Sequence, residues 1–234
     1  MKKGLIIAVD GPAGAGKSSS SRLLAERLGY RYIDTGALYR AVGLLAWEQG
    51  ISPENTQDLT ALCNSLTLRF VAGTEGIRLL LGERDVTIDI RKPEISQMAS
   101  KVSAHPVVRH CLLTLQRDLG KDGGVIMEGR DIGTVVFPDA DVKFYLDASP
   151  KERGHRRYAE LQQQGTPANL ATTVQEIAER DQRDSGREHA PLQRAADAVV
   201  IDTTTLSLAE VVGIMAGYAQ DRASGDDKRE NQPS

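Results

Sequence analysis

The sequence predicts an α/β protein in which a mostly parallel sheet is flanked by helices. Short apolar runs alternate with segments of helical periodicity along most of the 234 residues, which is typical of parallel strands joined by helical crossovers. A glycine-rich loop also stands between the first apolar run, at 5–9, and the first helical segment, at 17–28. A strand, a glycine-rich loop and a helix in this order are typical of a phosphate-binding unit.

The individual elements follow from these two patterns. Apolar runs predict strands at 5–9, 31–33, 124–128, 142–147 and 198–201. Helical periodicity predicts helices at 17–28, 37–49, 55–64, 92–103, 106–119, 150–164, 170–185 and 206–220. Pro150 fits the first turn of its helix, where the N–H that proline lacks has no partner within the helix.

One segment breaks the alternation of strands and helices. Three short apolar runs, at 66–71, 77–81 and 85–88, are separated by the turn sequences at 72–76 and 82–84. Short strands with tight turns predict an antiparallel meander inserted beside the main sheet. The final residues, 222–234, are polar and have no apolar periodicity, so we expect them to form a disordered tail.

The glycine-rich loop matches the phosphate-binding pattern G-x-x-x-x-G-K-[ST] in full, and it reads Gly11-Pro12-Ala13-Gly14-Ala15-Gly16-Lys17-Ser18. Its glycines let successive backbone N–H groups turn toward a phosphate, and the following helix adds its positive end. Lys17 is expected to contact the β and γ phosphates, and the Ser18 hydroxyl to ligate Mg²⁺. A chance match in an ordinary turn is the alternative, which the flanking strand and helix argue against. The loop predicts a nucleoside triphosphate site.

Composition limits the other partners of the chain. The net charge of −3 gives no general attraction to nucleic acid or to an anionic membrane. No apolar run approaches the ~20 residues of a membrane span, and the run at 5–9 is too short for a signal peptide. The two cysteines have no metal or redox spacing and are typical of reduced thiols. We therefore expect a cytoplasmic protein that binds neither nucleic acid nor a membrane. We also expect it to be a monomer.

A second ligand should lie near the carboxyl ends of the strands, where two polar clusters occur. Asp34, Thr35 and Arg40 follow the second strand, where Asp34 can hold Mg²⁺ through water and the other two can grip an anion. The alternative is structural, with Thr35 capping the next helix, Asp34 in the turn and Arg40 on a solvated face. Arg130 and Asp131 follow the strand at 124–128 and can bind a phosphate and an amino or hydroxyl group. An internal ion pair between these two residues is the alternative.

Arginines recur on two later predicted helices, and they are Arg153, Arg156, Arg157, Arg180, Arg183 and Arg187. Solubility is the usual explanation for such charged helices, with Arg180 and Asp184 as one i,i+4 pair. In a phosphotransferase, however, arginines that close over the nucleotide neutralise charge in the transition state and exclude water. Both interpretations remain open from these residues alone.

Taken together, these motifs resemble those of the bacterial cytidylate kinases, nucleoside monophosphate kinases that phosphorylate CMP and dCMP with MgATP. The resemblance covers residues 7 to about 218, and the string E-G-R-D-I-G-T-V-V-F-P at 128–138 is its most specific part. It implies a P-loop three-layer αβα fold with a five-stranded parallel sheet, an antiparallel β insert and a helical lid. It also implies a single kinase domain at 1–221, with a monophosphate-binding insert at about 62–92 and a lid at about 150–188.

The resemblance implies two binding sites on this chain. The ATP site would consist of Gly11, Pro12, Ala13, Gly14, Ala15, Gly16, Lys17, Ser18 and Ser19. Many members of the family have Thr at the second position after the loop lysine, where this chain has Ser19, but Ser18 keeps a hydroxyl for Mg²⁺. In the second site, Ser100, Arg109 and Asp131 match positions that read cytosine. A carboxylate, a guanidinium and a hydroxyl complement the amine donor and the N3 and O2 acceptors of that base.

The other matching residues contact the sugar and phosphates of the substrates. They are Thr35, Arg40 and Arg130 for the CMP ribose or phosphate, Arg180 and Asp184 for the ribose, and Arg187 for a phosphate near the lid. Arg153 and Arg157 match the lid arginines that close over ATP.

The predicted chemistry is direct in-line transfer of the γ-phosphoryl group. Positioning and charge neutralisation by Lys17, Arg130, Arg153, Arg157 and Mg²⁺ would supply the catalysis, and no general base is needed because the acceptor phosphate is largely ionised near pH 7. Another P-loop kinase, with UMP, AMP or a shikimate-like acceptor, is the nearest alternative. A nucleotide switch without enzymatic activity is a more distant one, and the chain has no obvious guanine-reading N-K-x-D motif.

Overall fold

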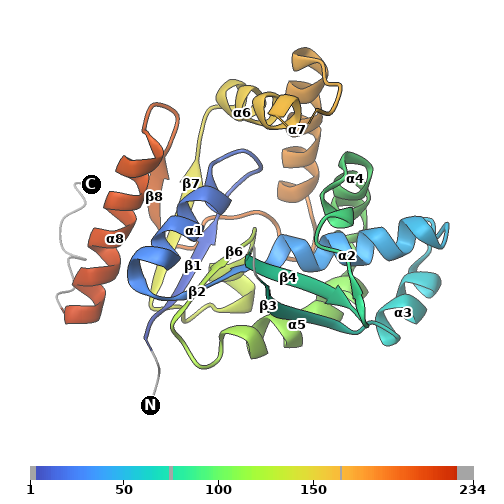
Figure 1. The fold of residues 1–234 in the computed structure, drawn as a ribbon, viewed down its shortest axis with the longest axis horizontal. Coiled ribbons are helices and arrows are strands. Elements are labelled where there is room, and N and C mark those ends of the chain that lie inside the picture. The colour runs from blue at the N-terminus through green and yellow to red at the C-terminus, as the bar shows by residue number, and fades with distance from the viewer. Residues whose placement is uncertain (1–3, 74–75, 164, 226–234) are drawn as a thin grey trace. The chain divides into compact units, whose positions relative to one another are not determined.

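A five-stranded parallel sheet forms the main sheet of the computed structural model, which describes residues 4–73, 76–163 and 165–225. Its strands lie in the order β2-β6-β1-β7-β8 (Figure 1). They are β1 (Ile6–Asp10), β2 (Arg31–Asp34), β6 (Val125–Glu128), β7 (Val142–Asp147) and β8 (Val199–Asp202). β1 pairs with β6 and β7, and β7 with β8, all in parallel. The prediction of five strands at these places is confirmed.

The chain divides into two compact units, and the first consists of residues 1–33 and 119–234. In this unit α1 (Lys17–Leu28) and α8 (Leu208–Ser224) pack together over the sheet. The strand residues Ile7, Phe144 and Ile201 share a buried core with Leu24 of α1 and Met215 of α8. This core fixes the amino end of α1, and with it the glycine-rich loop, against the carboxyl end of β1.

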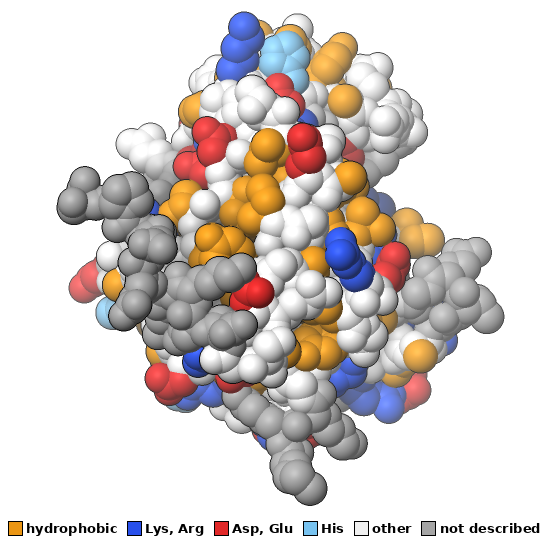
Figure 2. Space-filling view, turned by 90° about the vertical axis from the view of Figure 1, so that its left-hand side faces the viewer, with side chains coloured by type: hydrophobic (Ala, Val, Ile, Leu, Met, Phe, Trp, Pro, Cys, Tyr) orange, Lys and Arg blue, Asp and Glu red, His pale blue; other side chains and the backbone are white. Residues whose placement is uncertain are grey.

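Two further helices of the first unit, α6 (Pro150–Gln163) and α7 (Leu170–Ser185), occupy most of the predicted lid segment. Their close packing is evident at Gly154, where an added Cβ would lie 2.3 Å from a methyl group of Val174. Asn169 caps α7 by accepting a hydrogen bond from the Thr172 N–H. The face that carries α8 is shown in Figure 2, where hydrophobic side chains lie between polar and charged ones. Among the described residues of this unit, the large exposed hydrophobic ones are Leu23, Val200, Leu208, Ile214 and Tyr218.

The second unit, residues 34–118, contains the predicted insert. Its helices are α2 (Thr35–Glu48), α3 (Thr56–Asn64), α4 (Pro93–Val102) and most of α5 (Pro106–Gly120), and a short 3₁₀ turn, η1, covers Asp89–Arg91. α2 and α4 approach so closely that a Cβ at Gly43 would lie 2.8 Å from the backbone nitrogen of Ala99. The strands β3 (Leu68–Gly73), β4 (Gly76–Leu81) and β5 (Arg84–Asp85) form a separate antiparallel sheet in that order. The predicted class, αβα with an antiparallel insert, is confirmed.

The third strand of the insert is shorter than predicted. The pattern predicts a strand at 85–88, but β5 ends at Asp85. The Asp85 carboxylate accepts a hydrogen bond from the Thr87 N–H at 3.0 Å, which turns the chain out of the ladder. The Thr87 hydroxyl then accepts from the Leu79 N–H at 2.9 Å, and Ile88 is 83% exposed. The Thr87 hydroxyl therefore accepts the hydrogen bond that a backbone carbonyl oxygen of a longer strand would have accepted from Leu79.

At the carboxyl end of the chain, α8 extends to Ser224, three residues into the segment predicted to be a tail. Gly225 follows as the C-cap of α8, and residues 226–234 of that segment lie outside the described residues. Ser207 and Glu210 form a reciprocal capping box at the start of α8. Within 4–73, 76–163 and 165–225, no helix combines the length and the hydropathy of a membrane span.

Candidate active site

The predicted phosphate-binding loop lies between the carboxyl end of β1 and the amino end of α1, as its sequence requires. Gly11, Gly14 and Gly16 have φ values of 142°, 78° and 85°. A Cβ at Gly11 would lie 1.9 Å from the carbonyl oxygen of Leu146, so only glycine fits there. The first turn of α1 contains no acidic residue, and no side chain caps it. Backbone N–H groups and the positive end of α1 therefore face the loop, which suits an anion.

Lys17 stands at the first position of α1 and is only 7% exposed. Its Nζ donates a hydrogen bond to the Pro12 carbonyl oxygen at 2.7 Å. Burial lowers the pKa of Lys17 from 10.5 to about 7, and the nearby Arg130 adds to the effect while Glu128 opposes it. A phosphate beside this amine would favour its charged form, because it supplies the opposite charge that the loop lacks.

Ser18 points to a carboxylate that the sequence analysis did not assign. Its Oγ donates to Oε1 of Glu128 at 2.8 Å, and the Tyr32 hydroxyl donates to the same oxygen at 2.6 Å. Glu128 ends β6, the strand next to β1, and is 4% exposed. An acidic residue at the end of a buried strand adjacent to the loop strand is the signal that could have identified it.

Asp10 is a second unassigned carboxylate, at the last position of β1 and 4% exposed. It accepts hydrogen bonds from the backbone N–H groups of Ile132 at 2.8 Å and Gly133 at 2.7 Å. Burial raises the pKa of Asp10 to about 6, although these two N–H groups and Lys17 lower it. Asp10, the residue before the phosphate-binding loop, is therefore bonded to the segment that follows Arg130 and Asp131.

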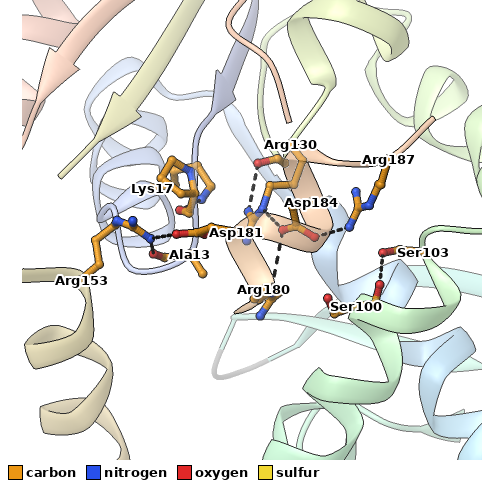
Figure 3. A network of polar contacts seen from close by, with 12 residues as sticks. Ala13, Lys17, Ser100, Ser103, Arg130, Arg153, Arg180, Asp181, Asp184 and Arg187 are labelled. Atoms are coloured by element: carbon orange, nitrogen blue, oxygen red, sulfur yellow. Dashed lines mark hydrogen bonds and ion pairs between the residues drawn. The ribbon is translucent and has the colours of Figure 1, made fainter. Parts of the chain in front are cut away.

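Asp184 of α7 is the centre of an arginine cluster in the first unit (Figure 3). Arg130 Nε donates to its carboxylate at 2.9 Å, Arg187 donates to its other oxygen, and Arg180 Nε lies 3.8 Å away. The side chain of Asp184 is 1% exposed. Burial alone would raise the pKa of Asp184, but the three guanidinium groups outweigh burial and hold it below its usual range. Solubility does not explain charges that are buried in this way.

The two predicted lid arginines, Arg153 and Arg157, have different environments. Arg153 is 4% exposed, and it donates to the Ala13 carbonyl oxygen of the loop at 3.1 Å and to Asp181 of α7. Arg157, the other predicted lid arginine, pairs with Glu160 on its own helix at 2.8 Å. Arg153 therefore contacts the loop, whereas Arg157 pairs with Glu160 along α6. Asp181, which orients Arg153, was missed because its partner lies 28 residues away.

Arg156 is also close to the loop, although it was not among the predicted site residues. Its guanidinium donates to the Thr203 carbonyl oxygen at 2.7 Å and to the Thr203 hydroxyl at 3.0 Å. That hydroxyl donates in turn to the Ala15 carbonyl oxygen of the loop at 3.1 Å. A Cβ at Gly16 would lie 3.8 Å from Arg156 Nη1. The chain after β8 is thereby tied to the loop.

In the second unit, Asp34 caps α2. Its carboxylate accepts from the Ala37 N–H at 3.1 Å and from Arg40 at 2.5 Å. Burial raises the pKa of Asp34, but Arg40 outweighs burial, so the pKa lies below its usual range. Asp34 is therefore the capping residue of α2, where the structural alternative expected Thr35. Arg40 pairs with Asp34 and is 18% exposed, where that alternative expected a solvated face. The role of Asp34 toward Mg²⁺ stays a prediction.

The predicted cytosine-reading residues of the second unit share one neighbour. The Ser100 carbonyl oxygen accepts from the Ser103 hydroxyl at 3.0 Å (Figure 3), and Arg109 donates to the Ser103 carbonyl oxygen at 3.1 Å. The guanidinium of Arg109 also lies 5.4 Å from the centre of the Tyr39 ring. Ser100 and Arg109 are 3% and 9% exposed, so both are held by packing.

A glycine loop around a buried lysine, with a cluster of arginines in the same unit, defines a P-loop kinase. The family model for cytidylate kinase matches residues 7–221. This chain belongs to the cytidylate kinase family.

Similar sequences agree with this assignment. The chain is 54% identical over 221 residues to the cytidylate kinase of Geobacter sulfurreducens, covering 94% of this chain and 95% of that protein. It is 51% identical over 227 residues to the cytidylate kinase of Geobacter sp. strain M21, covering 97% of each. Among solved structures, an uncharacterized protein from Eubacterium ventriosum has a TM-score of 0.50 at 11% identity, covering 92% of this chain and 98% of that one. The last similarity concerns the fold alone.

Proposed function

We propose that this protein transfers the γ-phosphoryl group of ATP to CMP or dCMP, giving ADP and CDP or dCDP. Membership of the cytidylate kinase family over residues 7–221 supports this proposal. The observation that carries it is the hydrogen bond at 2.8 Å from the Ser18 hydroxyl of the loop to Glu128, which stands two residues before Arg130 and so brings the loop and the Arg130 segment together in the first unit. A donor loop and an arginine on the adjoining segment can neutralise a phosphoryl group between them.

The residues around the loop fit a magnesium ion. The Ser18 hydroxyl and the Glu128 carboxylate are oxygen ligands of the kind that Mg²⁺ prefers, and they lie within 2.8 Å of each other. When bound with ATP, Mg²⁺ would offset part of the negative charge of the phosphates. We propose Ser18 as a direct ligand and Glu128 as the acceptor for water in the metal's shell. Asp34, the other predicted participant, is engaged with Arg40 and the start of α2.

The loop N–H groups and Lys17 would bind and orient the triphosphate, and Arg153 would approach it from α6. Arg130 would bind the acceptor phosphate, together with Thr35, Arg40 and Arg187. The chain then needs no general base, because the acceptor oxygen is largely ionised near pH 7. Arg130 and Arg187 already share the Asp184 carboxylate, which holds both guanidinium groups before a phosphate arrives. This order reduces the side-chain entropy lost on binding.

Discrimination among bases would rest on Ser100, Arg109 and Asp131, and ribose binding on Arg180 and Asp184. Uracil would direct an acceptor toward Asp131, and an unmatched buried acceptor costs about 1–3 kcal/mol. CMP should therefore be preferred over UMP by roughly 5-fold to 150-fold in kcat/KM.

An acceptor panel tests the proposed function. ADP formation is measured with CMP, dCMP, UMP, AMP and shikimate as acceptors and without any partner protein. CMP and dCMP should be the best acceptors, and Asp131→Asn should reduce CMP use selectively. Equal rates with AMP, UMP or shikimate would contradict the substrate assignment, and equal losses with every acceptor would make Asp131 a structural residue. The expected monomer and cytoplasmic location remain predictions, the first of which light scattering can check.

A further inference from the structure

The carboxylate of Asp10, the residue before the donor loop, is bonded to the segment at 130–133. We call this segment, which carries Arg130 and Asp131, the acceptor segment. The two oxygens of Asp10 accept the N–H groups of Ile132 and Gly133 at 2.8 and 2.7 Å, across 122 and 123 residues of sequence. Before this segment, the Gly129 N–H donates to the Val9 carbonyl oxygen at 3.0 Å. After it, the N–H groups of Val135 and Val136 donate to the Asp131 carbonyl oxygen in one wide helical turn at Ile132–Val136. The two bonds to Asp10 add to these bonds and hold the first N–H groups of the turn at the end of β1.

The segment held by Asp10 carries the residues proposed to bind the acceptor. Arg130 and Asp131 immediately precede the two bonded N–H groups, and Arg130 reaches the buried carboxylate of Asp184. On its other side, Asp10 is the last residue of β1 and is followed directly by Gly11 of the donor loop. One buried side chain thus joins the backbone of the donor loop to the backbone of the acceptor segment.

The surroundings of Asp10 leave little freedom for another arrangement. Asp10 is 4% exposed, and a Cβ at Gly133 would lie 3.4 Å from Asp10 Oδ2 and 3.1 Å from the side chain of Lys143. Lys143 itself bonds to Pro138 and Asp197. Gly133 is therefore packed between the carboxylate and a fixed lysine side chain, and a shift of the segment would break one contact or the other.

From this geometry we infer that Asp10 is a positioning residue for CMP use, which sets Arg130 and Asp131 at a fixed place relative to the donor loop. The inference rests on the proposed function, because it takes Arg130 and Asp131 as acceptor-binding residues. Asp10 itself is not assigned any contact with a substrate. Its loss should therefore affect the use of CMP while leaving direct binding of ATP in place.

Asp10→Asn tests this inference with little change in volume. An asparagine has one acceptor oxygen and one NH₂ group, so one of the two N–H groups would face a donor in a buried place. The KM for CMP should rise by about 5-fold to 150-fold, since an unmatched buried N–H costs about 1–3 kcal/mol. The dissociation constant of MgATP, measured by calorimetry without CMP, should change less than about threefold, within ordinary surface effects.

Asp141→Asn is the matched control. Asp141 also accepts a hydrogen bond from a backbone N–H of the same sheet, that of Ile6 at 2.7 Å, but at the amino ends of β1 and β7. Its substitution should lower the thermal unfolding temperature without raising the KM for CMP. Gly133→Ala is a second variant, which displaces the same segment while it leaves the carboxylate in place and should show the same rise in KM.

The outcomes separate the possible failures. A raised KM for CMP in Asp10→Asn and Gly133→Ala, with MgATP binding intact, supports the inference. An unchanged KM for CMP overturns the inference. Equal losses of CMP use and MgATP binding also overturn it, because a merely destabilised protein would show the same losses. If Asp10→Asn does not fold, the KM of Gly133→Ala decides. If the wild-type protein does not phosphorylate CMP at all, the proposed function fails instead.

Discussion

Binding of ATP should be accompanied by uptake of a proton on Lys17. Burial, with a contribution from Arg130, lowers the pKa of this amine to about 7 in the free protein. At pH 8 an amine with this pKa is about 90% unprotonated, and triphosphate binding should return it to the charged form. Binding should then take up about 0.9 proton per site at pH 8, and about 0.1 at pH 6, where the amine is already charged.

Calorimetry in several buffers measures this uptake. The observed enthalpy of MgATP binding is plotted against the ionisation enthalpy of the buffer, and the slope gives the number of protons exchanged. Lys17→Arg is the control, because a guanidinium stays charged at both pH values and should show no uptake at pH 8. A slope near zero for the wild-type protein at pH 8, with binding still measurable, would refute the reasoning.

The same pKa shift predicts how stability depends on pH. Because the pKa of Lys17 is lower in the folded state than its usual 10.5, the unfolded chain binds more protons between pH 7 and 10. The free energy of unfolding of the ATP-free protein should therefore rise with pH in this window, by up to about 1.4 kcal/mol per pH unit from this group. Lys17→Met should remove that part of the slope in urea unfolding, and identical slopes for both proteins would contradict the assignment.

Three further changes have defined outcomes. Glu128→Gln should raise the Mg²⁺ concentration needed for half-maximal ATP binding about tenfold, which a calorimetric titration of Mg²⁺ would show. Asp184→Ala should lower the free energy of unfolding in urea by about 3 kcal/mol, because buried guanidinium groups lose their partner. Gly14→Ala should abolish ATP binding, since its φ is 78° and its Cβ would lie 2.9 Å from Arg153, whereas Gly29→Ala, with φ 67° and nothing within 4 Å, should only lower stability.

Local sequence patterns were enough to predict most of the fold. The five strands and the helices appeared where apolar periodicity placed them, because each element must bury one face or stripe. The donor loop was equally clear, since left-handed glycines and a lysine at the start of a helix are properties of consecutive residues. The short β5 was not predicted, because the bond from Thr87 N–H to Asp85 that ends it competes with strand pairing.

The candidate site was only partly visible in the sequence. Sequence patterns and family resemblance assigned roles to the loop, Arg130 and Asp184, but gave none to Asp10, Glu128 or Asp181. The role of each of these three carboxylates depends on a partner that is distant in sequence. For Glu128, this partner is the hydroxyl of Ser18, 110 residues away. A local pattern cannot show whether an acidic residue is solvated or buried against such a partner.

The sequence by itself thus determined the elements, the donor loop and the family, because these depend on the periodicity and order of neighbouring residues. Only the tertiary structure decided which charges meet. It gathered three arginines around Asp184, carried Arg153 to the loop while Arg157 paired along its own helix, and bonded Asp10 to the acceptor segment. The physical reason is that a buried charge is tolerated only where the folded chain brings a partner to it, and that meeting depends on the packing of the whole unit.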